Sequence, residues 1–167
     1  MAAFTGTPTG SAQYNKQVTA PVPGIAAALA EGRLKVAPFS YTHAAGAGTG
    51  EINLFKLPAG PIIFYPALCR ILTTAFVATA DLHLGYRAHV DQNGAAVVAD
   101  DNAFADNLDV GGAAIDLGPL NGGWPLPAIG HFAFNSQGGV VLYTLIDTAN
   151  IEDADTIAGW VAWASTN

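Results

Sequence analysis

Four histidines are the residues of this 167-residue chain best suited to metal binding or proton transfer. His83 and His89 are predicted to share one face of a strand, but six residues of strand separate them by about 20 Å, at ~3.3 Å each. They cannot bind one metal ion together, although His131 could join either of them across strands. We expect all four histidines, His43 included, to be solvated or interface side chains, and we predict no metal site.

Acidic pairs are the second candidate for acid–base chemistry. Asp100 and Asp101, like Asp153 and Asp155, lie in polar, alanine-rich segments with nothing nearby to raise a pKa, so we expect solvated carboxylates. The segment Asp91–Gly94 resembles the start of a calcium loop, but the remaining ligands of such a loop are absent. A plain turn is therefore the favoured interpretation.

Motifs of the common enzyme classes are missing from the sequence. It has no G-x-S-x-G elbow, phosphate-binding loop, dinucleotide-binding glycine pattern or zinc spacing. The single cysteine, Cys69, stands among apolar neighbours and is expected to be an inert buried thiol. A cupin-like metalloenzyme would need clustered His and Glu, yet no His-x-His occurs and only three Glu are present. We therefore predict a protein that is not an enzyme and has no cofactor or catalytic residue.

Three aromatic residues, Trp124, Tyr143 and Trp160, could stack on a sugar ring if they were exposed. Trp124 lies in the loop 118–127, which is rich in Gly and Pro. Burial of these rings in the core or in a subunit interface is the favoured alternative.

The first 24 residues are predicted to form an extended N-terminal arm, because Thr, Pro, Gly and Ser dominate and cannot build a core. The remaining residues, 25–167, are predicted to form one domain. This domain opens with a short helix at 25–31, and Pro38 places the following strand, 34–41, at a sheet edge. A loop at 44–50 and strands at 52–57 and 62–65 follow, with a strand buried on both faces at 68–77.

Residues 82–90 show the clearest strand pattern. Leu82, Leu84, Tyr86, Ala88 and Val90 share one parity, which predicts that they face inward.

Downstream of this strand, the turn at Asp91–Gly94 leads into a short strand at 95–99. We expect one helical turn at 101–108, a strand at 110–117, a hairpin joining 128–134 to 140–147, and a last strand at 156–164. Spacing of about ten residues between strands, with no long amphipathic helix, predicts an all-β fold: a single-domain β-sandwich or jelly roll.

Charge and composition bear on partners. Charged residues make up only 11% of the chain, while 51% are hydrophobic, which indicates a surface that partners cover. No cationic cluster exists for nucleic-acid binding, and no run reaches the length of a membrane helix. The N-terminus lacks signal-peptide features, so we expect synthesis in the cytoplasm.

Positive charge is concentrated before residue 81 and negative charge after it, which suggests two faces with different neighbours.

The segment 82–110 resembles a recurrent segment of small head proteins of tailed phages: a strand ending in "GY-A", a D-x-x-G turn, an Ala/Val strand and an acidic "AF-D-L-DV" turn. The C-terminal pattern "I-G-V" is similar as well. The matching residues are Gly85, Tyr86, Ala88, Asp91, Gly94, Ala103, Phe104, Asp106, Leu108, Asp109, Val110, Ile157, Gly159 and Val161.

This resemblance covers roughly the last 90 residues and implies a capsid decoration or cement protein, or the base of a head fibre. It implies a place on the virion exterior, the major capsid protein as partner, and self-association as a homotrimer. A carbohydrate-binding head-fibre or tail-fibre module on the same fold is the alternative. The residues expected to attach the arm and the strand after it to a capsid are Tyr14, Lys16, Val18, Val22, Arg33 and Lys35.

Overall fold

The computed structural model describes residues 9–10, 34–44, 50–77, 79–118, 124, 130–147 and 151–165, the first two by their backbone alone. In this part of the chain nearly every element is a strand, and the helical structure is one 3₁₀ turn, η1 (Pro66–Leu68). None of these residues belongs to a helix long and apolar enough to cross a membrane. The helix expected at 25–31 lies outside the described residues.

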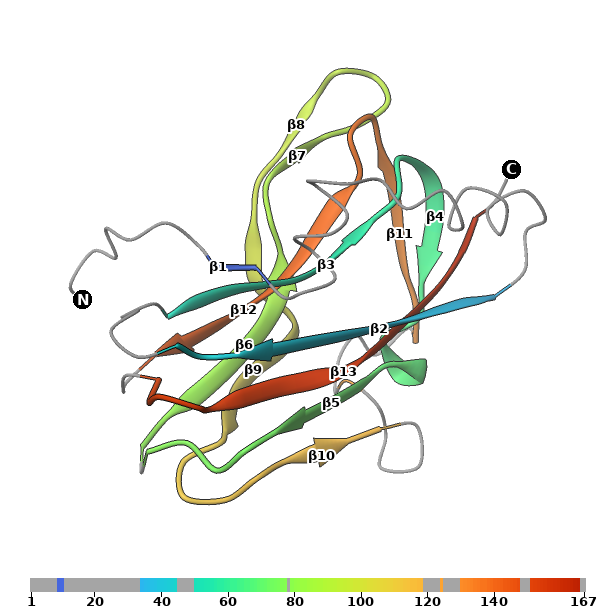
Figure 1. Cartoon of the computed structure of the whole chain (residues 1–167). Helices are drawn as coiled ribbons and strands as arrows, with labels where there is room; N and C mark the ends of the chain where they lie inside the picture. Colours follow the sequence, from blue (N-terminus) through green and yellow to red (C-terminus); the bar gives the residue numbers. More distant parts are fainter. Residues whose placement is uncertain are drawn as a thin grey trace.

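Two antiparallel sheets pack face to face (Figure 1). Sheet A contains, in spatial order, β1 (Thr9–Gly10), β3 (Glu51–Leu57), β12 (Val140–Asp147), β6 (Asp81–Tyr86) and β9 (Asp100–Asp109). Sheet B is built around β13 (Thr156–Ser165), which pairs with β2 (Lys35–Thr42), β5 (Arg70–Thr73) and β4 (Gly60–Phe64). Beyond these, β10 (Asp116–Leu117) pairs with β5, and β11 (Phe132–Ser136) pairs with β4. The chain passes repeatedly between the sheets, as in a jelly roll, and the predicted all-β sandwich is confirmed.

Aromatic rings from both sheets fill the space between them. Phe64 of β4 and Phe104 of β9 meet edge to face with ring centroids 5.0 Å apart, and Phe55 lies 5.3 Å from Trp163. All four rings are almost fully buried. Such burial contributes about 25 cal/mol per Å² of apolar surface, and it joins segments far apart in the sequence.

The predicted alternation at residues 82–90 is confirmed only in its first half. Leu82 and Leu84 point into the core, but Ala88 and Val90 are exposed. After Tyr86 the chain leaves sheet A and forms a separate hairpin of β7 (His89–Val90) and β8 (Ala96–Val97). The predicted turn at Asp91–Gly94 is confirmed: Gly94 has φ +86°, and its N–H donates to the Asp91 carbonyl.

The helical turn expected at 101–108 is wrong, because these residues lie in the ten-residue strand β9. Its partner β6 would otherwise leave one edge unpaired, and pairing across sheet A outweighs the weak local helical preference. The register shifts along this pair, and Asn107 has φ +50°. These irregularities break the simple alternation and conceal the strand in the sequence.

The strand expected at 68–77 is shorter than predicted. β4 and β5 both pair with β13, and η1 separates these two strands along the chain. The chain leaves the sheet after Thr73. Similarly, the strand expected at 110–117 is limited to Asp116–Leu117.

The segment 128–147 does not form the predicted hairpin. β11 pairs with β4 in sheet B, whereas β12 pairs with β3 and β6 in sheet A. The intervening turn therefore carries the chain from one sheet to the other. Gly139 is required there: it has φ +84°, and a Cβ would lie 2.4 Å from the Leu57 carbonyl oxygen.

Candidate functional site

Two of the three predicted aromatics are buried: Trp124 in the core, as the favoured alternative predicted, and Tyr143 beneath a side chain on the outer face of sheet A. Trp124 is 2% exposed and packs against Phe64 and Phe104, with ring centroids 5.6 and 5.9 Å away. Tyr143 is 5% exposed. Trp160 is partly exposed and belongs to sheet B. The structure does not bring the three rings together as a stacking platform.

Tyr143 lies beneath Arg87 on the outer face of sheet A. The Arg87 guanidinium carbon is 3.9 Å from the centre of the Tyr143 ring. Its Nη1 donates to Glu51 Oε2 at 2.6 Å, and its Nε donates to Asn53 Oδ1 at 3.0 Å. Burial raises the pKa of Tyr143 to about 12, and the Asp101 carboxylate adds to the increase. The phenol therefore stays protonated well above neutral pH, and the cluster joins β3 and β12 to Arg87, the residue that follows β6.

Trp160 belongs to a second cation–aromatic cluster, on the outer face of sheet B. Arg70 lies over the Trp160 ring at 5.1 Å and binds Asp116 through two hydrogen bonds of 2.9 and 2.8 Å. These bonds raise the pKa of Arg70 and lower that of Asp116. The Trp160 indole N–H donates to the Leu68 carbonyl at 3.0 Å. Arg70 thus covers one face of the Trp160 ring, and the indole N–H is engaged by backbone.

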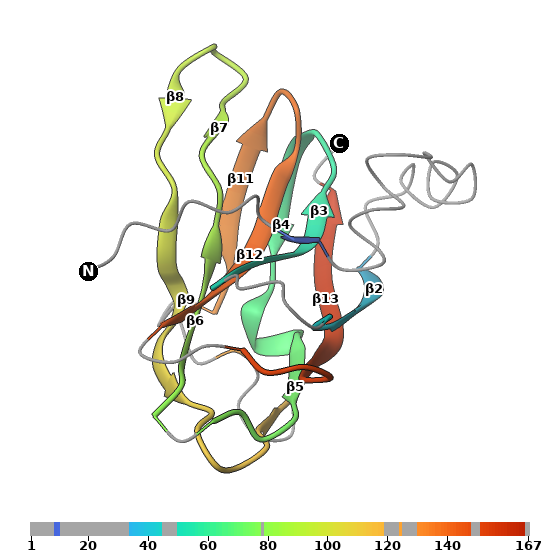
Figure 2. The ribbon, with the colours of Figure 1, turned by 60° about the vertical axis from the view of Figure 1, so that its left-hand side comes forward.

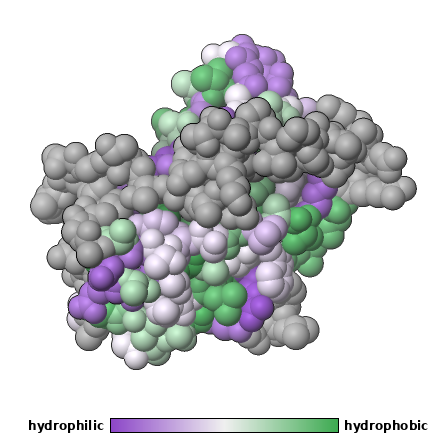
Figure 3. All heavy atoms as spheres, viewed as in Figure 1, coloured by the Kyte–Doolittle hydropathy of each residue, from purple (hydrophilic) through white to green (hydrophobic). Residues whose placement is uncertain are grey.

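The outer face of sheet B is poor in charge. Next to Trp160, the register places small or apolar residues on β2 and β13, among them Val36 opposite Ala162 and Pro38 opposite Trp160 itself. Val36 is 58% exposed and Leu68 is 40% exposed. Figure 3 shows this side of the molecule with green and pale areas interrupted by smaller purple ones.

The outer face of sheet A is acidic. Asp147, Asp81 and Asp109 are direct neighbours on β12, β6 and β9. His83 lies beside them, with Nδ1 3.0 Å from Asp106 Oδ1 and Nε2 3.5 Å from Asp147 Oδ2. No set of three or more His, Cys, Asp or Glu among the described residues has the arrangement of a metal site.

The histidines do not converge. His83 and His89, predicted on one strand face, belong to different strands, and His83 is buried instead of solvated. His43 is also buried, and its Nδ1 lies 2.8 Å from the Tyr41 hydroxyl. His131 is exposed. We expected solvated or interface histidines, but His43 and His83 are buried within the chain beside neighbouring polar groups.

One of the predicted solvated carboxylates is buried as well. Asp155 is 9% exposed, and its oxygens accept hydrogen bonds from the Thr74 hydroxyl and the Glu152 N–H. It closes the turn before β13, a role that its place in a polar loop concealed. Asp101 and Asp153 are exposed as predicted, and Asp100 is half-buried.

Cys69 is buried in the core, as predicted. Burial raises the pKa of its thiol to about 12, so the reactive thiolate is scarce at neutral pH. Its sulfur accepts the Ala162 N–H at 3.3 Å, where η1 interrupts the pairing with β13.

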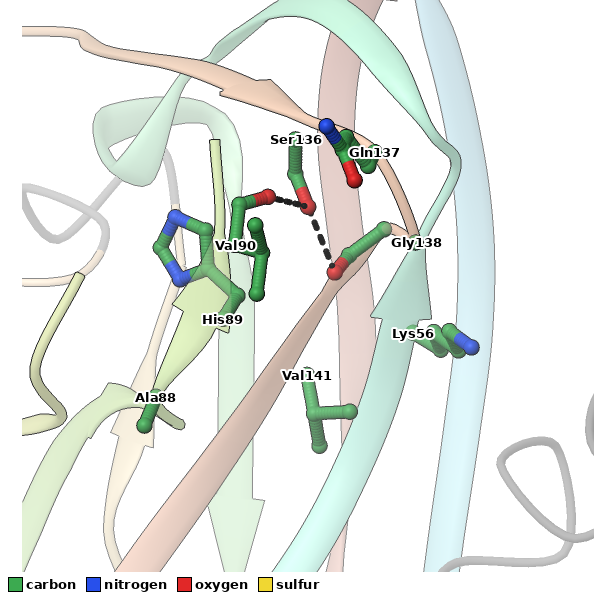
Figure 4. Close-up of a pocket in the computed structure, with 9 residues that line it drawn as sticks. Lys56, Ala88, His89, Val90, Ser136, Gln137, Gly138 and Val141 are labelled. Atoms are coloured by element: carbon green, nitrogen blue, oxygen red, sulfur yellow. Dashed lines mark hydrogen bonds between the residues drawn. The ribbon is translucent and has the colours of Figure 1, made fainter. Parts of the chain in front are cut away.

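A shallow pocket of about 450 Å³ lies at the base of the β7–β8 hairpin. Figure 4 shows β7, the start of β12 and β3 around it, with Lys56 at one side. The Ser136 hydroxyl lies 3.0 Å from the Gly139 carbonyl oxygen and 3.2 Å from that of Val90. His89 Nδ1 contacts the Arg87 carbonyl at 3.1 Å. The hydroxyl and the imidazole are therefore each engaged by backbone, and they do not form a nucleophile–base pair.

Of the residues predicted to attach the arm, only Lys35 is described. It is half-buried, and its ammonium donates to the Ser165 hydroxyl at 2.9 Å. Tyr14, Lys16, Val18, Val22 and Arg33 lie outside the described residues. Within the arm, Thr9–Gly10 pairs in parallel with Ile52–Asn53 at the edge of sheet A.

Sequence reasoning did not identify the contacts of Arg87 or the exposure of the apolar strand β8. The sequence pattern does not show the contacts of Arg87, because its partners Glu51 and Tyr143 are distant in sequence. For β8, the uncharged run Ala95–Ala99 is a usable signal of an unusual strand. It lacks the alternation of apolar and polar residues that would mark one face as the inner one.

Comparison with known proteins supports the fold. No family model matches the chain, and no curated protein matches it. Among solved structures, a chain of the Ralstonia phage GP4 capsid is similar with a TM-score of 0.57 and 14% identity, over 96% of this chain and 99% of that one. A chain of the cyanophage Pam1 capsid is similar with a TM-score of 0.51 and 13% identity, over 80% and 86%. At these identities, the likeness shows a shared fold.

Proposed function

We propose that this chain is a structural protein of a phage virion, and specifically a decoration or cement protein on the outer surface of the head. In this role it would bind neighbouring major capsid subunits and stabilise them against separation. The observation that carries the proposal is the similarity to a chain of the Ralstonia phage GP4 capsid, which extends over almost the whole length of both chains.

The two outer faces of the sandwich support this role because they suit different surroundings. Sheet B presents few charges among the described residues, and its exposed ion pair Arg70–Asp116 neutralises itself. Such a face can be covered by another subunit without leaving an unpaired charge. Sheet A presents the aspartate row of β12, β6 and β9, which favours contact with water.

The arm adds contact area in this proposal. We infer that residues 1–24, through Tyr14, Lys16, Val18 and Val22, order against a capsid subunit, and that Arg33 and Lys35 extend the contact. Self-association as a homotrimer belongs to the same proposal, because capsid lattices offer local three-fold positions.

Co-sedimentation with capsids tests the proposal. Purified protein is mixed with capsids that lack it, and the pellet is expected to contain it in near-stoichiometric amounts that saturate. Heating the decorated and bare capsids should then show a higher disruption temperature for the decorated ones. An absence of saturable binding to any capsid of the source phage would contradict the proposal.

Binding of a carbohydrate is the alternative function, and the positions of the three aromatic residues speak against it. Trp124 and Tyr143 are buried, and Trp160 is held between Arg70 and the Leu68 carbonyl. We expect no signal above background on a glycan array, with a galactose-binding lectin as the positive control.

A further inference from the structure

The β7–β8 hairpin is a projecting element that the proposed function does not use. Figures 1 and 2 both show it extending beyond the ends of the two sheets. Its second strand is lined by Ala95–Ala99, a run without charge or hydrogen-bonding side chains. Val98 is 79% exposed, the highest value among the described large apolar residues, and Ala95, Ala96 and Ala99 are exposed as well. An apolar strand of this kind in water is a typical interaction element.

The hairpin is held firmly in place at its base. Gln92 N–H donates to the Asn135 carbonyl, and Gln137 N–H donates to the Val90 carbonyl, both within 3.0 Å. The Gln92 side-chain amide donates to the Ser136 carbonyl at 3.0 Å. β7 is therefore bonded on both sides, to β8 and to the β11–β12 turn. Little conformational entropy remains to be lost when a partner binds.

One edge of β8 is unpaired in the described structure, since β8 pairs with β7 alone. The Asp91 N–H donates to the Ala95 carbonyl, which makes these two residues a hydrogen-bonded pair. Hydrogen-bonded pairs alternate along an antiparallel ladder, so Val97 also bonds toward β7. The N–H and C=O groups of Ala96 and Val98 consequently point to the free edge.

Two longer edge strands, β2 and β9, carry features that oppose strand addition, and the short strand β8 does not. Pro38 interrupts the row of donors on β2. β9 carries Asp100, Asp101, Asp106 and Asp109, whose charges repel a further strand of the same kind. β8 has neither device between Gly94 and Asp100.

We propose that β8 binds β8 of a second copy of this chain, antiparallel and two-fold symmetric, with Val97 on the axis. Ala96 of each copy then exchanges two backbone hydrogen bonds with Val98 of the other, and a four-stranded sheet β7–β8–β8–β7 results. This contact goes beyond the proposed attachment to a capsid and does not depend on it.

Charge is compatible with a second copy as partner and selects the antiparallel direction. In the antiparallel register, residues whose numbers sum to 194 lie opposite each other, so Asp100 faces Gly94 and Asp101 faces Asn93. No carboxylate opposes another. A parallel in-register pairing would set Asp100 against Asp100 and Asp101 against Asp101, which is destabilising.

Disulfide trapping tests this register. In an antiparallel pair that is not hydrogen-bonded, opposite Cα atoms lie about 4.5 Å apart, within the range that a disulfide spans. Val97→Cys is therefore expected to give a symmetric covalent dimer under mild oxidation. The native Cys69 is buried and does not compete.

Val98→Cys is the matched control. Val98 is more exposed than Val97, so random collisions would cross-link Val98→Cys faster. In the proposed register, Val98 faces Ala96 instead of itself, and we expect Val97→Cys to cross-link at least about tenfold faster. Equal rates, or a faster reaction of Val98→Cys, would overturn the proposal.

Two further variants keep the result interpretable. Val98→Lys in the Val97→Cys background should slow cross-linking at least about fivefold, because two added charges meet at the edge, whereas Val36→Lys should not. If Val97→Cys does not fold, a mixture of Ala95→Cys and Ala99→Cys proteins should form a mixed disulfide that neither forms alone. Absence of that mixed disulfide would refute the register, and saturable capsid binding in the same preparations would leave the proposed function intact.

Discussion

At the scale of single residues, the groups that resembled candidates for chemistry serve the structure. Cys69, Tyr143 and Asp155 are each enclosed by backbone or by side chains of distant strands. Their environments keep Cys69 and Tyr143 protonated at neutral pH. The raised pKa values of Cys69 and Tyr143 each lead to a prediction that can be measured.

Cys69 is expected to resist thiol reagents in the folded protein. With a pKa of about 12, only about one thiol in 10⁴ is ionised at pH 8, and the sulfur is also shielded from solvent. Reaction with a chromogenic disulfide reagent at pH 8 should be negligible over hours, and should become stoichiometric within minutes in 6 M guanidinium, about the strength that unfolds most domains. Rapid labelling of the native protein would show that the thiol is accessible.

Tyr143 is expected to make stability fall at high pH. Its pKa is about 12 in the folded chain and about 10 in the unfolded one, so the unfolded chain loses this proton first as the pH rises. The contribution is complete below pH 10 and is lost between pH 10 and 12, up to about 3 kcal/mol for two pKa units.

Urea unfolding of the native protein and of Tyr143→Phe between pH 9 and 12 measures this effect. Other groups also titrate between pH 9 and 12, and comparing the native protein with the variant cancels their contribution to stability. The native protein should lose more stability than the variant over this interval; parallel decreases in both would contradict the assignment to Tyr143.

At the scale of elements, close approach between strands depends on particular residues. Gly85 of β6 faces β9 so closely that a Cβ would lie 1.9 Å from the Asp100 carbonyl oxygen. This glycine belongs to the "GY-A" pattern noted in the sequence, and the contact explains why no larger residue fits there. The irregular pairing of β6 with β9 follows from the same contact.

Gly85→Ala is therefore expected to destabilise the fold by about 3 kcal/mol, since the backbone of β9 must shift to admit the methyl group. Gly138→Ala is the matched control, because no atom lies within 4 Å of a Cβ there. We expect it to change stability by less than about 0.5 kcal/mol. Denaturant titration of both variants decides, and similar midpoints for the two would contradict this explanation.

The arm is the second element whose role can be measured. Deletion of residues 1–24 is expected to leave the melting temperature within a few degrees, because a segment rich in Thr, Pro, Gly and Ser cannot build a core; its described residues, Thr9–Gly10, pair with two residues of β3. Capsid binding, measured by co-sedimentation, should weaken markedly. If the deletion unfolds the domain, the arm is an integral part of sheet A and not an attachment segment.

At the scale of the whole molecule, charge is distributed by face more than by position in the chain. Among the described cations that precede residue 81, Arg70 pairs with Asp116 and Lys35 binds Ser165, both on sheet B. The carboxylates of Asp81, Asp109 and Asp147 collect on sheet A. An assembly contact through sheet B would thus rely mainly on apolar burial.

Capsid binding is accordingly expected to depend only modestly on salt. Raising the ionic strength from about 0.05 to 0.5 M shortens the screening length from roughly 14 to 4 Å, and exposed ion pairs contribute about 0–1 kcal/mol each. The dissociation constant, measured by co-sedimentation across this range, should change by less than about tenfold. A change of several orders of magnitude would show that charge dominates attachment.

Strand content and fold class could be predicted from the sequence because they depend on local properties. Turn residues such as Asn93 and Gly94, apolar runs at intervals of about ten residues and the lack of amphipathic helices act over a few residues. For the same reason the inward side of β6, the edge position of β2 and the buried thiol of Cys69 were correct expectations.

Only the tertiary structure decided which strands pair and which polar groups meet. β9 became a strand because β6 offers it an edge, and the segment 132–147 crosses between sheets because β4 and β3 provide separate partners. Arg87 meets Tyr143 through contacts that span more than fifty residues of sequence. Local preferences are worth a fraction of a kcal/mol per residue, whereas pairing and burial act on whole strands, so long-range contacts prevail wherever the two disagree.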